Sequence, residues 1–267
     1  MTEAFVRCTN CMNLPSARLK NGSSPLLDPW CPPRGWAGTT RTGRRTVFVL
    51  ALNPGAPMDG ERDLWSKWGM TAGKSSSAAT QKLLTHCTSN YMAPSRGRDT
   101  VFHRKSVGLA RAALWLFGAQ DFDDPSWIDQ CWFTDIYKCS TKSERGPNIP
   151  AGALAACRQH LNAELEMFSP RVILTLGSRA MRAMQGAPTQ IPTVAFRFPS
   201  GGGLAALSSP ALNVQFKAIA DIAERPWTPE LEGEFDSYRK KLQASLFGGS
   251  SDTIVATRAE AALNQRV

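Results

Sequence analysis

Residues 132–177, WFTDIYKCSTKSERGPNIPAGALAACRQHLNAELEMFSPRVILTLG, read as a strand, a loop, a helix and a second strand. The first seven residues are aromatic and β-branched, which is typical of a strand, and the SERGPNIP stretch is too rich in breakers for regular structure. Residues 151–168 carry apolar side chains at helical spacing, and residues 171–177 form an apolar run that ends at a glycine. A strand–helix–strand unit of this kind needs more of the same sheet around it.

Two further stretches supply that sheet. VFVLAL (residues 47–52) is a buried strand broken by NPG, and TVAFRF (residues 193–198) alternates as a strand before FPSGGG breaks it. We also expect helices over residues 106–117, 178–186 and 213–224 and a charged amphipathic helix ending at residue 247, with a basic loop that carries Arg96, Arg98, Arg104 and Lys105 before the first of them. The pattern predicts one α/β domain over residues 1–247, a three-layer α/β/α arrangement with a central, mostly parallel, four-stranded sheet, followed by a disordered tail over residues 248–267.

Composition narrows the classes of protein that fit. A hydrophobic share of 42% is enough for a real core, and no apolar run approaches the ~20 residues of a membrane span. The N-terminus is no secretory signal, so we expect a cytoplasmic protein without a membrane partner. The net charge of +9 suits a polyanionic partner, although a charge surplus often belongs to a solvated face. Seven cysteines without a secretory signal favour metal ligation or buried thiols over disulfides.

TDIYKC, AAC and SPRVILTLG occur in an order and at a spacing that resemble the iron–sulfur branch of the uracil-DNA glycosylase superfamily. The resemblance spans roughly residues 5–225 and implies that family's fold, with DNA as the partner; we expect a monomer. ALNPG (residues 51–55) stands at the first catalytic motif and is similar to the form found in the mismatch-specific branch. By that match Asn53 positions the water that attacks the deoxyribose C1′. The nearby carboxylates Asp59, Glu61 and Asp63 are alternatives, or simply a solvated acidic turn.

The cysteines permit several interpretations. Cys8 and Cys11 form a C-x-x-C that alone is compatible with zinc, a cluster, a redox pair or chance. The resemblance implies that these two join Cys139 and Cys157 around a [4Fe–4S] cluster, since four soft thiolates suit one. They suit structural zinc too, and the four could also be unconnected. Cys31, Cys87 and Cys131 match no family position and are interpreted as small buried hydrophobes.

Asp135 stands where the family has an asparagine that donates to uracil O4 and accepts from N3–H. An ionised aspartate only accepts, so it retains the N3–H bond but opposes the O4 lone pairs. Either Asp135 is protonated in the site, or the base is not uracil, or uracil is cleaved poorly. A base edge with two donors would suit an aspartate best.

The remaining site residues come from two other stretches. Trp65 stands where the family carries an aromatic that stacks on the extruded base, although ordinary core packing is an equal alternative. Phe198-Pro199-Ser200 replaces the histidine-containing second motif. Ser200 and the amides of Gly201 and Gly202, beside Pro199, can contact phosphate or the leaving group, with Leu204 as the wedge in the vacated stack. A flexible glycine linker is the alternative for this loop.

The resemblance implies a DNA glycosylase of base excision repair. Such an enzyme flips uracil or another deaminated base from DNA and hydrolyses its N-glycosidic bond. No lysine is placed for Schiff-base chemistry, so we expect a monofunctional enzyme. Asp135 and the missing histidine motivate an alternative from another class, a non-catalytic iron–sulfur protein that binds nucleic acid with the same fold.

Overall fold

The computed structural model describes residues 36–38, 45–52, 61–70, 76–92, 100–119, 124–138, 151–185, 187, 189–197, 199 and 206–247. The predicted tail over residues 248–267 and the N-terminal C-x-x-C lie outside these residues. None of the helices in the described part of the chain is both long and apolar enough to cross a membrane.

The centre of the fold is a sheet with strand order β1-β3-β2-β4-β5. Its four longer strands, β3, β2, β4 and β5, run parallel, which confirms the predicted sheet, and a two-residue strand pairs antiparallel at the β3 edge. Every residue of β2, β3 and β4 is buried, as expected for apolar strands covered on both faces. The strands are β1 (Trp36–Ala37), β2 (Val47–Ala51), β3 (Cys131–Asp135), β4 (Val172–Leu176) and β5 (Thr193–Phe196).

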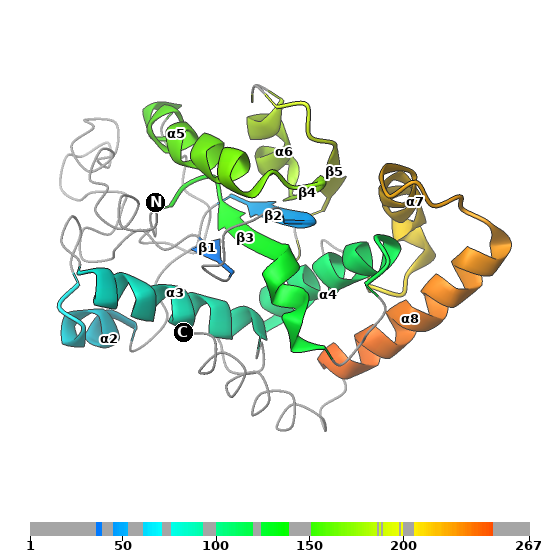
Figure 1. Cartoon of the computed structure of the whole chain (residues 1–267), viewed down its shortest axis with the longest axis horizontal. Coiled ribbons are helices and arrows are strands. Elements are labelled where there is room, and N and C mark those ends of the chain that lie inside the picture. Colours follow the sequence, from blue (N-terminus) through cyan, green and yellow to red (C-terminus); the bar gives the residue numbers. More distant parts are fainter. Residues whose placement is uncertain are drawn as a thin grey trace, which may run out of the picture.

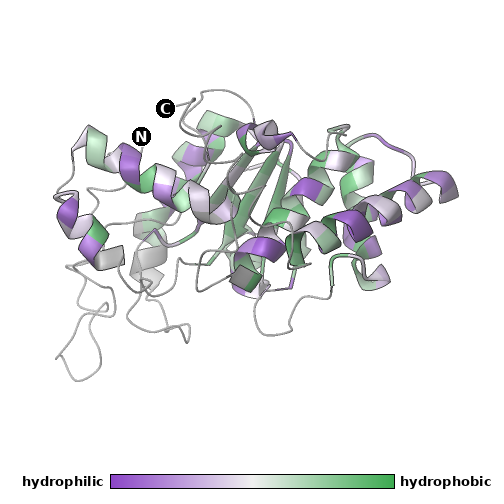
Figure 2. Cartoon of the chain, turned by 90° about the horizontal axis from the view of Figure 1, so that it is seen from below, coloured by the Kyte–Doolittle hydropathy of each residue, from purple (hydrophilic) through white to green (hydrophobic). Residues whose placement is uncertain are grey.

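Helices cover both faces of this sheet, so the predicted three-layer α/β/α architecture is confirmed. Figure 1 shows α5 (Ala151–Phe168) and α6 (Ser178–Met184) above the sheet, and α3 (Ser77–Met92) and α4 (Thr100–Leu116) below it. α7 (Asn213–Ile222) and α8 (Pro229–Phe247) lie beyond β5, and α2 (Glu61–Lys67) lies near the start of α3. In Figure 2 the strands form a hydrophobic centre between helices of mixed character.

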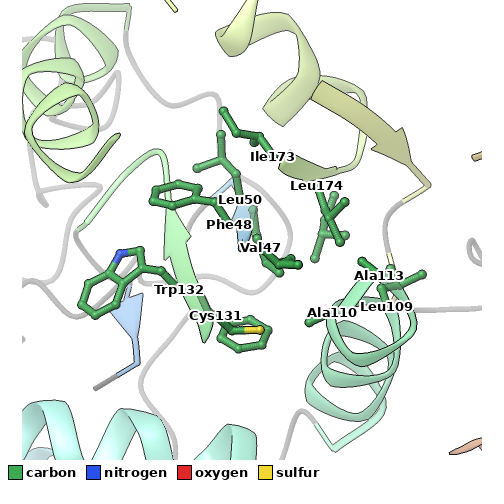
Figure 3. Packing of buried hydrophobic residues seen from close by; sticks show 14 of the residues in the cluster. Val47, Phe48, Leu50, Leu109, Ala110, Ala113, Cys131, Trp132, Ile173 and Leu174 are labelled. Carbon is green, nitrogen blue, oxygen red and sulfur yellow. The ribbon is translucent and has the colours of Figure 1, made fainter. Parts of the chain in front are cut away.

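The main core forms where α4 crosses the sheet. Figure 3 shows side chains of β2, β3 and β4 packed together with Leu109, Ala110 and Ala113 of α4, and these three α4 residues are completely buried. Small residues on α4 let the helix approach the strands closely. Cys87 and Cys131 lie in this core, and burial raises the pKa of the Cys131 thiol far above its ordinary value, against the opposing charges of Arg45 and Arg111. Both thiols are therefore small buried hydrophobes, as predicted.

Three helices differ from the sequence-based expectation, and one of them, α2, stands where the sequence suggested an acidic turn. α4 begins at Thr100 rather than residue 106, so Arg104 and Lys105 belong to a helix and not to a basic loop; Arg96 and Arg98 lie outside the described residues. α3 was not predicted, although Ala79, Leu83 and Cys87 recur every fourth residue and are buried. Its inner face mixes the large apolar residues Leu83, Leu84 and Met92 with small and polar ones such as Thr80 and Thr88, which weakens the hydrophobic periodicity that signals a helix.

The edge strand β1 is held by contacts with α3 and β3. The Thr88 hydroxyl donates to the Gly38 carbonyl at 2.8 Å and accepts from the Gly38 amide at 3.1 Å, and both groups are buried. A Cβ on Gly38 would lie 2.3 Å from the Trp132 ring, so the backbone can approach β3 here only because residue 38 has no side chain.

Helix α8 is tied to the chain before α7 by a buried arginine. Arg239 has no exposed side-chain surface and its guanidinium carbon lies 5.2 Å from the Phe216 ring centroid and 4.9 Å from that of Phe235. It donates to Asn213 Oδ1 at 2.8 Å and to the Leu207 carbonyl at 3.3 Å. Together with an ion pair to Asp236, these contacts offset much of the cost of burying the guanidinium charge.

Candidate functional site

The carboxyl ends of the four parallel strands meet at one edge of the sheet. The register pairs Ala51 at the end of β2 with Asp135 at the end of β3. The ladder continues past both strands, because the Ile136 amide donates to the Ala51 carbonyl and the Tyr137 amide to the Leu52 carbonyl, each at 3.0 Å. In open α/β sheets this edge is where ligands bind, so the two segments that leave β2 and β3 together form the candidate site.

Within the part of the chain that the structure describes, Asp135 brings a polar side chain to the centre of this edge, at the end of β3. Its side chain is buried, with 8% of its surface exposed. Because side chains alternate along a strand, Asp135 lies on the same face of β3 as Phe133. The Phe133 ring stacks on Tyr91 of α3 with centroids 4.2 Å apart, and Tyr91 meets His103 of α4 edge-on at 4.7 Å. The α3–α4 side therefore provides an aromatic wall along the face that carries Asp135.

The opposite face of β3 carries a buried ionic network that the sequence did not reveal. Lys138 Nζ lies 2.7 Å from Glu164 Oε2 of α5, and the side chains are 1% and 0% exposed. The Thr134 hydroxyl donates to the Glu164 carboxylate, with its oxygen 3.1 and 3.0 Å from the two carboxylate oxygens, and Lys138 also donates to Thr134. Burial raises the pKa of Glu164, and the Lys138 ammonium and the hydrogen bonds oppose that rise.

His160 lies one turn before Glu164 on α5. Burial, and then the charge of Lys138, lower the pKa of this half-buried imidazole. Reasoning from the sequence placed all three histidines away from the second motif and gave none a role. The signal that could have found the network is the i, i+4 spacing of His160 and Glu164 on the apolar face of α5 that also bears Cys157 and Leu161.

Four of the predicted site residues lie in the described part of the chain: Trp65, Asp135, Cys157 and Pro199. Trp65 is 1% exposed and packs in the hydrophobic core, so core packing is its role in this structure and base stacking stays a prediction. Cys157 is buried on the inner face of α5, and Pro199 is buried after β5. The others lie outside the described residues, namely Asn53, Ser200, Gly201, Gly202, Leu204, Cys8, Cys11 and Cys139.

The alternative carboxylates at the start of α2 have a simple structural account. Asp63 is exposed, as expected for a solvated carboxylate, but it lies on a helix that begins at Glu61 rather than in a turn, and Asp59 lies outside the described residues. Asp135 is thus the predicted base-contacting residue that the described structure brings to the carboxyl edge, directly beside the strand that leads to Asn53.

The fold and this edge define an α/β/α protein with a parallel sheet and a buried carboxyl group where ligands bind. The family model described as the uracil DNA glycosylase superfamily matches residues 44–228, and the chain belongs to that superfamily. A comparison with curated proteins gave no match. The superfamily consists of DNA glycosylases, which are hydrolases that act on DNA in repair. The matched range contains all four parallel strands and ends just before α8.

Proposed function

We propose that this protein is a monofunctional DNA glycosylase that extrudes a deaminated base from DNA and hydrolyses its N-glycosidic bond. The observation that supports the proposal most is the register of β2 with β3, which pairs Ala51 with Asp135. Asn53 follows Leu52 by one residue, so the residue proposed to hold the water and the residue proposed to read the base begin from adjacent strand ends.

In the proposed reaction the bond from C1′ to the base nitrogen breaks, and a bond from C1′ to the water oxygen forms. The water loses a proton, and the departing base gains one. The Asn53 amide carbonyl can orient the water but is a poor base. The mechanism therefore needs a sugar that already has oxocarbenium character, together with stabilisation of the departing base as an anion.

Asp135 is proposed to select the base. An ionised carboxylate accepts two hydrogen bonds and donates none, so it favours a base edge that presents donors over the uracil edge, which presents O4. A buried acceptor facing another acceptor costs free energy because neither is satisfied. Uracil, hypoxanthine and xanthine each present a carbonyl oxygen beside a ring N–H. We propose that Asp135 accepts from that N–H and donates to the oxygen only when it is protonated. Ser200, the neighbouring glycine amides and Leu204 would grip the backbone and fill the vacated stack, and Trp65 is the candidate aromatic for the extruded base.

We further propose that Cys8, Cys11, Cys139 and Cys157 hold a [4Fe–4S] cluster. The observations that support it are the four thiols in the sequence and the position of Cys157, buried on the face of α5 that packs against β3. Such a cluster would tie the N-terminal segment and the chain after β3 to α5. An absorbance scan of anaerobically purified protein tests this: a broad band near 400 nm is expected, and its absence together with bound zinc would replace the cluster by a zinc site.

The activity itself is tested with oligonucleotides that each carry one uracil, hypoxanthine, xanthine or mismatched thymine, in single-stranded and duplex form. Abasic product is expected from at least one of them. One observation favours another function: Asp135 stands where the family has an asparagine, as expected if the protein binds nucleic acid without cleaving it. If the protein binds the oligonucleotides but forms abasic product from none of them, the glycosylase proposal is refuted and the non-catalytic binding function is retained.

A further inference from the structure

We propose that the buried Lys138–Glu164 pair is a positioning device for Asp135, which fixes the end of β3 so that the base-reading carboxyl group stays beside the end of β2. For its catalytic consequence this inference rests on the proposed function. Lys138 and Glu164 are positioning residues in this proposal, because they act through the backbone that carries Asp135.

The contacts surround Asp135 along the chain. Thr134, directly before it, donates to the Glu164 carboxylate, and Lys138, three residues after it, is ion-paired to the same carboxylate at 2.7 Å. One carboxylate of α5 therefore holds the backbone on both sides of Asp135. Because Thr134 lies on the α5 face of β3 and side chains alternate along a strand, the Asp135 side chain lies on the opposite face.

A purely structural role does not account for this choice of residues. Burying an ion pair carries a large desolvation penalty, and well-packed apolar side chains of similar volume are often as stabilising or more so. An ion pair with a shared hydroxyl has one advantage over apolar packing, namely a directional geometry that allows a single arrangement of its members. A strand end that must present one carboxyl group at a defined place benefits from that geometry.

The network also protects the last two bonds of the β2–β3 ladder. The Ile136 and Tyr137 amides donate to Ala51 and Leu52 beyond the ends of the strands, at the point where an unsupported sheet would fray. Both amides lie between Thr134 and Lys138, so loosening the network should release them first. This gives the proposal a readout that does not depend on catalysis.

The decisive variant is Lys138→Met combined with Glu164→Leu, which removes both charges and keeps the volume. We expect it to fold with a thermal stability lowered only by the loss of the Glu164 and Lys138 partners of the buried Thr134 hydroxyl. It should bind abasic-site analogue DNA with unchanged affinity and lose kcat by about 10- to 100-fold, since small misplacements of positioning groups have effects of that size. The differences in kcat/KM among the four lesion bases should also become smaller. Exchange of the Ile136 and Tyr137 amides with deuterium should quicken by about tenfold or more, as local opening becomes easier.

Thr134→Val is a second, milder variant that retains the ion pair and serves if the double variant does not fold. It should raise the same two exchange rates and lower kcat in the same direction. Arg45→Met is the matched control, because Arg45 is also buried and donates to the Asp129 carbonyl at 2.6 Å, but at the opposite, amino edge of the sheet. It should lower thermal stability while kcat, base preference and the two exchange rates stay at wild-type values.

A folded double variant with wild-type kcat, base preference and amide exchange would overturn the proposal, as would an Arg45→Met protein that reproduces the same changes. If the wild-type protein cleaves none of the four lesions, the proposed function fails, and the exchange rates of Ile136 and Tyr137 still decide whether the pair positions the strand end.

Discussion

Replacing Asp135 by asparagine should increase the excision of uracil by this protein. Asp135 is 8% exposed. Its backbone is held by the register with Ala51 and by the hydrogen bond of the next amide, that of Ile136. The substitution therefore exchanges one oxygen for an NH₂ group in a buried site whose shape stays the same. The carboxylate offers uracil O4 a second acceptor, whereas the amide offers it a donor.

The size of the effect follows from this burial. Leaving a buried acceptor without a donor costs ~1–3 kcal/mol, and each ~1.4 kcal/mol corresponds to a factor of ten in rate. We therefore expect kcat/KM for uracil to rise about 10- to 100-fold. The assay is the formation of abasic product from matched oligonucleotides that carry uracil, hypoxanthine or xanthine.

Asp124→Asn is the matched control for this prediction. Asp124 precedes the 3-10 helix η3 (Pro125–Gln130), and its carboxylate accepts from the Ser126 amide at 2.8 Å, at the other end of β3. The same chemical change there should leave kcat/KM for every base unaltered. A correctly folded Asp135→Asn protein that excises uracil no faster than the wild type would refute the reasoning that Asp135 faces the base edge.

Three further predictions concern other parts of the molecule. Asn53→Ala should abolish cleavage while DNA affinity stays the same; unchanged turnover in a single-turnover assay would remove Asn53 from the mechanism. Thr88→Val should lower the free energy of unfolding by ~2–4 kcal/mol, because the buried amide and carbonyl of Gly38 both lose their partner, and a denaturation midpoint equal to that of the wild type would contradict this account of β1. His160 has a lowered pKa in the folded protein, so the unfolded chain binds more protons between that pKa and 6.5, and stability should rise with pH across this window. His160→Gln should flatten the rise in urea midpoints measured across that range, and an unchanged slope would show that His160 is not its source.

Much of the fold could be predicted because the signals are local. β2 is a wholly apolar run, and β3 and β4 are mostly apolar with Thr134, Asp135 and Thr175 as their polar members. The helix expected over residues 151–168 has those bounds in the structure. Local signals fail where few residues carry them. β1 is two residues long, too short for any periodicity, and the buried face of α3 mixes leucines with small and polar residues such as Thr80 and Thr88, which weakens the periodicity.

The candidate site divides in the same way. Asp135 could be found from the sequence because it lies at the end of a strand and within the TDIYKC motif. Its difference from the family asparagine, an acceptor in place of a donor, follows from the residue type alone. Its support was missed, because Lys138 and Glu164 are 26 residues apart and only the position of Glu164 on the apolar face of α5 indicates a buried charge. Both become buried when α5 packs on β3.

The sequence by itself therefore determined the strands, the superfamily and the identity of the residue at the carboxyl edge, since each depends on short runs of residue types. The tertiary structure decided which charges are buried, which strand ends lie side by side, and which carboxylate holds the backbone around Asp135. The physical reason is that hydrophobic periodicity is written into neighbouring residues, whereas the free energy of a charge depends on the groups and the solvent that the folded chain places around it.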